Sequence, residues 1–242
     1  SGIKVTGSTI KSGTGAISLT GSCRSGTNKY LGSGGLTFNS PQTSVSSTSG
    51  AVTLSSPSDS SFDFINLALS GGGTHTVSAY SVSNTNDSSF QARGTGDFIL
   101  TSPTGSSGFF GALNIPATWD LGSTYKNISI LDVPTTLTSS KSFNISANLV
   151  ATQSVTIRGL TISGTGGVTA PTLAMQSFST VSNFCKLSGT SNVTTLALNA
   201  TFADSTSSGT LGIVDADGWM PGNFGPVTAK YGVPFKLVFS TQ

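Results

Sequence analysis

The sequence has few charged residues and no glutamate. Of its 242 residues, only 20 carry a full charge, 11 as lysine or arginine and 9 as aspartate. That is 8%, against about 25% in an average globular domain. The shortage argues against helical bundles and coiled coils, which are built largely from Ala, Glu, Lys, Leu and Arg. A net charge of +2 argues against nucleic-acid binding, which requires many neutralised phosphates, and against charge-driven disorder.

Residues suited to acid–base catalysis are also scarce. His75 is the only histidine, and it closely follows three consecutive glycines. This context favours a surface position in a glycine-rich hairpin over the base of a hydrolase triad. A glycosidase needs two carboxylates, and Asp215 and Asp217 are more easily explained as part of a turn. We therefore expect no enzymatic activity, with a polysaccharide-processing enzyme on a β-helix as an alternative.

Serine and threonine make up much of the chain. There are 43 serines and 35 threonines, which together are almost a third of the sequence. Short alternating or continuous apolar runs recur between clusters of Gly, Ser, Asn and Pro, a pattern typical of strands and turns. The predicted strands are residues 3–5, 16–20, 36–38, 52–54, 62–69, 76–82, 97–101, 127–131, 143–150, 155–162, 193–202, 211–214 and 235–239. The fold class is therefore all-β.

One short pattern recurs in the first half of the chain. The segment 15–20, Gly-Ala-Ile-Ser-Leu-Thr, is echoed at 50–55 and more loosely at 96–101. In this pattern the N-terminal segment resembles the β-helical repeats of filamentous-haemagglutinin-type adhesins, which implies a right-handed parallel β-helix. The spacing from the first copy to the second differs from the spacing to the third, however, whereas solenoids usually keep their period.

The two cysteines, Cys23 and Cys185, bear on this choice. In an exported protein they are candidates for one disulfide bond. Such a bond within one subunit is incompatible with a simple β-helix, because rungs spaced about 4.8 Å apart would hold the two residues far from each other. We therefore predict an antiparallel β-sandwich or jelly roll, with the parallel β-helix as the alternative.

The domain organisation has two solutions. We favour a single all-β domain spanning residues 1–242. The segment 102–108, Ser-Pro-Thr-Gly-Ser-Ser-Gly, has the composition of a linker or a long loop. The alternative is therefore two β domains, 1–102 and 109–242. No apolar run is long enough for a membrane-spanning helix, and the uncharged, hydroxyl-rich composition indicates an extracellular or cell-surface protein.

Three kinds of candidate site remain. Asp215 and Asp217 precede Gly218 in a turn that partly resembles a calcium loop, so we expect no cofactor other than a calcium ion at this turn. Trp219, in the same turn, is a candidate for stacking on a sugar or anchoring a partner. Five sequons permit glycosylation, although the Ser/Thr content alone accounts for about that many; they begin at Asn86, Asn127, Asn144, Asn192 and Asn199.

Strand-like segments at both termini suggest how the protein acts. Ile3 and Val5 lie in the first segment, and Phe235, Leu237 and Phe239 lie in the last. Terminal strands can extend a neighbour's sheet, and few charges protect the edges here. We expect a non-enzymatic filament or fibre subunit that binds copies of itself. Surface glycans are the other expected partners, in an adhesive role. The alternative is a carbohydrate- or receptor-binding module of a phage or viral fibre or capsid, with Trp219 or Trp119 exposed.

Overall fold

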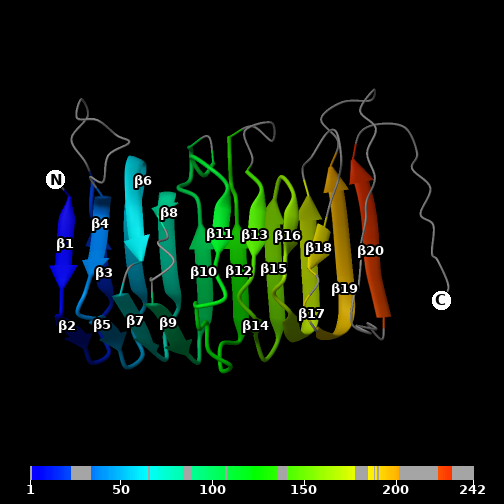
Figure 1. Cartoon of the computed structure of the whole chain (residues 1–242). Coiled ribbons are helices and arrows are strands. Elements are labelled where there is room, and N and C mark those ends of the chain that lie inside the picture. Colours follow the sequence, from blue (N-terminus) through cyan, green and yellow to red (C-terminus); the bar gives the residue numbers. More distant parts are fainter. Residues whose placement is uncertain are drawn as a thin grey trace.

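The protein is a stack of parallel β-strands (Figure 1). The structure, a computed structural model, describes residues 2–22, 34–64, 66–83, 89–106, 108–135, 141–177, 185–187, 189, 191–201 and 223–230. All strand pairings in these ranges are parallel, and none of these residues is helical. Each strand pairs with strands one turn of the chain earlier or later. The architecture is a parallel β-solenoid, and we call one turn a rung.

The strands form one large sheet and two small ones. Sheet A contains β1 (Ile3–Thr6), β3 (Ile17–Thr20), β4 (Gly34–Asn39), β6 (Val52–Phe64), β8 (His75–Ser83), β10 (Asp97–Thr101), β12 (Asn127–Leu131), β14 (Leu149–Val150), β15 (Ser154–Gly159), β17 (Val168–Ser177), β19 (Asn192–Thr201) and β20 (Asn223–Lys230). Sheet B contains β2 (Thr9–Ser12), β5 (Thr43–Ser47), β7 (Asn66–Gly71) and β9 (Ser89–Gly94). Sheet C contains β11 (Leu113–Ile115), β13 (Phe143–Ile145), β16 (Ile162–Gly164) and β18 (Cys185–Leu187). Sheet B thus belongs to the first rungs, and sheet C to the later ones.

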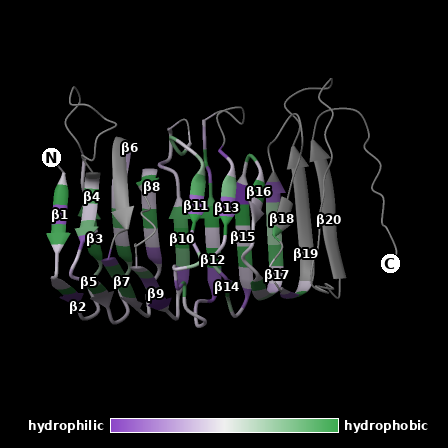
Figure 2. Cartoon of the chain, viewed as in Figure 1, coloured by the Kyte–Doolittle hydropathy of each residue, from purple (hydrophilic) through white to green (hydrophobic). Residues whose placement is uncertain are grey.

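The core consists of columns of apolar side chains that point into the solenoid. Alternate residues of a strand face inward, and Figure 2 shows the hydrophobic positions recurring along the strands. One column follows the printed register through Leu19, Leu54, Val77, Leu100, Ile130, Ile157 and Met175. The second runs through Ile17, Val52, His75, Phe98, Ile128, Val155 and Leu173. Fully burying one such aliphatic side chain contributes about 1.5–3 kcal/mol.

The predicted antiparallel sandwich or jelly roll is wrong. Alternating apolar residues show that a strand has one buried face, but they do not distinguish an antiparallel partner from a parallel one. The unequal spacing was also misleading, because rungs of this solenoid differ in length. In the second core column, the rung from Ile17 to Val52 is much longer than the rung from Val155 to Leu173. The loops absorb these differences, so the rungs stay in register. The β-helical architecture implied by the adhesin resemblance is present.

The structure does not test the predicted disulfide bond between Cys23 and Cys185. The structure shows no disulfide bond among the residues it describes, and Cys23 lies outside them. Cys185 begins β18, where it pairs with Ile162 of β16. The strand that precedes Cys23 in the chain, β3, is separated from β17 by six successive pairings in sheet A. At about 4.8 Å per rung, the separation between β3 and β17 is about 29 Å.

Between β10 and β12 the chain makes a long turn that includes β11 of sheet C. Sheet A continues across this turn, because Phe98 of β10 pairs with Ile128 of β12. Ser102 is fully buried, and its hydroxyl accepts a hydrogen bond from the Val133 N–H at 2.8 Å. The described part of the chain contains no helix long and apolar enough to cross a membrane.

Candidate functional site

The structure describes only some of the predicted site residues. Cys23, Asn86, Asp215, Asp217, Trp219, Phe235, Leu237 and Phe239 lie outside the described residues. The calcium turn and the C-terminal assembly strand therefore stay predictions. Within the described ranges, no group of three or more His, Cys, Asp or Glu side chains is arranged to hold a metal ion.

The sequons at described positions differ in their surroundings. Asn127, at the start of β12, donates from Nδ2 to Asp97 Oδ1 at 2.8 Å and accepts at Oδ1 from the Ser154 hydroxyl at 2.7 Å. A glycan on Nδ2 would have to compete with this polar ladder along the outer face of sheet A. Asn144 of β13 is exposed, while Asn192 and Asn199 both lie within β19.

In the part of the chain that the structure describes, no strand covers the outer side of the first rung. Ile3 is 37% exposed, whereas its partner in the next rung, Leu36, is fully buried. Val5, Ile10 and Leu19 are also only partly buried, although their partners in the second rung are fully buried. Within the described residues, β1, β2 and β3 each pair on one side only, with β4, β5 and β6. The rung therefore presents both apolar side chains and free strand edges.

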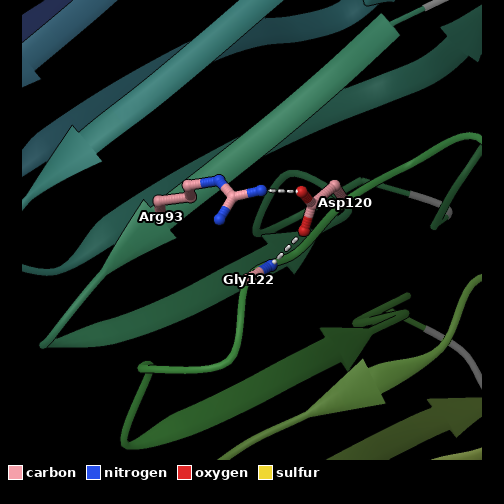
Figure 3. Close-up of polar contacts among 3 residues, drawn as sticks. All are labelled: Arg93, Asp120 and Gly122. Atoms are coloured by element: carbon pink, nitrogen blue, oxygen red, sulfur yellow. Dashed lines mark hydrogen bonds and ion pairs between the residues drawn. The ribbon is translucent and has the colours of Figure 1, made fainter.

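A second feature is a hollow of about 290 Å³ beside the last strand of sheet B. The next turn of the chain joins β9 through one parallel bridge, between Gln91 and Asp120. Figure 3 shows Arg93 of β9 directed toward Asp120, whose carboxylate also faces Gly122. Arg93 Nη2 forms an ion pair with Asp120 Oδ2, and Asp120 Oδ1 accepts the Gly122 N–H at 2.9 Å. The lining of the hollow therefore includes an ion pair and a hydrogen-bonded carboxylate, in a protein with few charged residues.

A third feature lies inside the core. His75 occupies the column position between Val52 and Phe98, and it is fully buried, so the predicted surface position is wrong. Its Nδ1 lies 2.5 Å from the Tyr125 hydroxyl, and its Nε2 has no hydrogen-bond partner. Desolvation lowers the pKa of His75 and raises the pKa of Tyr125. A substrate in solvent has no access to this imidazole.

We expect the buried His75 to make the stability of the protein depend on pH. The unfolded chain takes up a proton on this residue near the ordinary pKa of about 6.5, whereas the folded chain resists it. Stability is therefore complete above about pH 6.5 and falls as the pH drops below it, by at most about 1.4 kcal/mol per pH unit. Urea unfolding between pH 7.5 and 5 measures the effect.

The control is a double variant in which Val replaces His75 and Phe replaces Tyr125. Because the chain has no other histidine, the free energy of unfolding of this variant should no longer fall between pH 6.5 and 5. An unchanged pH dependence contradicts the assignment of the effect to His75.

Comparison with known proteins finds no matching family, no matching curated protein and no matching solved structure. Function must therefore be argued from the geometry of this chain.

The sequence did not predict the roles of Arg93, Asp120 and Tyr125. These residues become neighbours only because a rung brings distant segments together: 27 residues separate Arg93 from Asp120, and 50 separate His75 from Tyr125. A signal was present in the glycines at positions 50, 73 and 96, which are evenly spaced. That period places His75 in the core column, between Val52 and Phe98.

Proposed function

We propose that the chain is a non-enzymatic, extracellular structural protein, a subunit of a filament or fibre that assembles end to end by β-strand addition. The observation that carries the proposal is the uncovered first rung. Its inward residues continue the core columns, yet Ile3 is 37% exposed while most of the inward residues behind it are buried. Covering these side chains with another rung would remove apolar surface from water, which is favourable.

The parallel topology favours an open polymer. Sheet A begins at β1 and ends, in the described residues, at β20, so its two free edges face opposite directions along the stack (Figure 1). A second copy displaced along the axis would place its last rung against the first rung of its neighbour, with all strands still parallel. Such a head-to-tail contact joins two different surfaces and does not close on itself, so it generates filaments rather than dimers.

The outer surface is compatible with this role. Ser18, Thr53 and Thr76 lie at successive outward positions of sheet A. Uncharged hydroxyl side chains of this kind do not repel an approaching copy. The inward positions of the first rung are occupied by Ile3, Val5, Ile10, Ile17 and Leu19. Among the described residues, this edge therefore has no inward-pointing charge of the kind with which edge strands often block unwanted pairing.

Charges placed on the inward face of β1 should abolish assembly. Ile3→Asp combined with Val5→Asp would bury two carboxylates in any rung–rung contact, at a cost of several kcal/mol. We expect polymers formed by the wild-type chain, seen by negative-stain electron microscopy and sedimentation velocity, to be lost in this variant.

The matched control uses the other face of the same strand. Lys4 and Thr6 point outward from β1 and are exposed, so Lys4→Asp combined with Thr6→Asp should leave polymers intact. A wild-type chain that stays monomeric contradicts the proposal, and so does a chain lacking residues 1–10 that polymerises normally. Circular dichroism verifies that each variant keeps its β-structure.

A binding module remains the second candidate, but not through Trp119. That side chain is only 3% exposed, and its ring packs on Phe90 with the centroids 4.8 Å apart. The expected exposure of Trp119 is therefore wrong, and Trp219 stays a prediction. The observation that favours a binding role is the hollow beside Arg93 and Asp120.

A further inference from the structure

The hollow exists because a strand is missing from the regular stack. Sheet B ends at β9, and the following turn of the chain touches it through the Gln91–Asp120 bridge instead of a complete strand. The turn after that contributes Asn148 and Val150 to the same hollow. These two successive rungs therefore contribute no strand to sheet B among the described residues, and the surface beside β9 is recessed.

The backbone around the hollow is firmly held. The Asp120 N–H donates to the Phe90 carbonyl at 2.9 Å, and the Asp120 carbonyl accepts the Ala92 N–H at 2.8 Å. The Asn148 side-chain oxygen accepts the Gly167 N–H at 2.9 Å. These bonds fix the side chains that face the hollow before any ligand arrives, which lowers the entropic cost of binding.

The polar groups combine donors with acceptors and carry no net charge. Arg93 and Asp120 form an ion pair whose side chains are 62% and 42% exposed, so solvent-facing N–H groups and carboxylate lone pairs remain beside each other. Because Asn148 uses its oxygen toward Gly167, its amide N–H groups are oriented as further donors. Ligand hydroxyls both donate and accept, so they match this mixed set.

Apolar side chains complete the hollow. Val150 lines it together with the polar groups, while Trp119 and Leu121 are almost fully buried and add little accessible surface to the lining. At about 290 Å³, its size lies near the lower end of the range of about 300–1,000 Å³ for small-molecule pockets. The hydroxyl rim of a pyranose ring matches this mainly polar lining.

We propose that this hollow is a binding site for a neutral sugar of one or two rings, with Asp120 as the main acceptor and Arg93 and Asn148 as donors. The site is separate from the first rung, so it does not depend on the assembly proposal. A filament of such subunits would display the site once per copy, and multivalency would strengthen weak single contacts.

Saturation-transfer NMR with named sugars tests the site. The neutral probes are glucose, galactose, mannose, N-acetylglucosamine and maltose, and glucuronate is the charged comparison, each at millimolar concentration. We expect saturation transfer to at least one of the neutral probes in the wild-type protein, and at least a fivefold weaker signal in Asp120→Ala. The matched control is Gln91→Ala, because Gln91 is exposed on the same strand as Arg93 but does not line the hollow; its signal should equal that of the wild type.

Three outcomes overturn the proposal. The first is no transfer to any of the five sugars, and the second is an equal signal in Asp120→Ala and the wild type. The third is binding of glucuronate alone with loss in Arg93→Ala, which would identify an anion site instead. Thermal melts establish that Asp120→Ala is folded, and Arg93→Ala provides a second pocket variant if it is not. Polymer formation by the same samples reports on the first rung, so a failure here leaves the assembly proposal standing.

Discussion

Replacement of Gly73 by alanine is expected to destabilise the solenoid by about 3 kcal/mol. Gly15, Gly50, Gly73 and Gly96 stack in successive rungs, immediately before the strands of sheet A. A Cβ atom on Gly73 would lie 2.5 Å from the carbonyl carbon of Gly50, and closer still to its oxygen. Real Cβ atoms do not approach backbone so closely, so the two rungs would have to separate.

The expected cost is large because backbone must move. Overpacking of this kind costs about 3 kcal/mol, and for a domain of this size each kcal/mol lowers the Tm by about 2–4 °C. We therefore expect Gly73→Ala to lower the Tm by about 6–12 °C in differential scanning calorimetry. Gly111→Ala is the control, because a Cβ atom there has no heavy atom within 4 Å. Equal melting temperatures for the two variants would refute the glycine-stack explanation.

The same glycines show how much of the fold the sequence contained. The echo between residues 15–20 and 50–55 is a real register, with Ile17 opposite Val52 and Leu19 opposite Leu54. The interval from the second copy to the third spans two rungs of equal length, and the intervening copy is Gly73-Thr74-His75-Thr76-Val77. This copy is hard to detect because histidine occupies the position where the other copies have an aliphatic or aromatic residue.

The choice between sandwich and solenoid could not be made from strand patterns. Inward and outward residues alternate with a period of two in either fold, so the strands at 97–101 and 127–131 were predicted correctly while their pairing was not. What decides the pairing is the path of the loops. Loops of different lengths return the chain to the same position in the next rung, and the glycines that precede the strands of sheet A do not by themselves say whether the partner strand is parallel.

The hollow beside β9 was harder to predict from the sequence than the strand pairing. Arg93 and Asp120 are isolated charges in sequence, without a motif around them. Their proximity depends on the rung from Phe98 to Ile128, which is longer than the rung before it and therefore returns the chain to β9 near Asp120. Only a correct count of residues per rung would have placed them together.

Asp132 is the residue whose loss should come closest to the effect of Gly73→Ala. It follows β12 and is fully buried, which is costly for a carboxyl group without partners. Its Oδ1 accepts the Phe109 N–H at 3.0 Å, and its Oδ2 accepts the Lys141 N–H at 2.7 Å. The two donors lie in the segments that precede β11 and β13, so one side chain ties both to the core.

We expect Asp132→Ala to destabilise the protein by about 3 kcal/mol, because two backbone N–H groups lose their acceptor and each costs about 1–3 kcal/mol when buried and unpaired. Asp132→Asn keeps one acceptor oxygen and should lose about half as much. Urea unfolding measures both, with Asp97→Ala as the control, since the Asp97 carboxylate is only partly buried and accepts from Asn127 on the outer face.

If Asp132→Ala has the same free energy of unfolding as this control, the two segments are held by the packing of Phe109 on Phe143, whose ring centroids are 5.8 Å apart, and not by the carboxylate. If it unfolds as predicted, the segments that lead into β11 and β13 depend on a single buried acid, in a chain that has only nine acids in all.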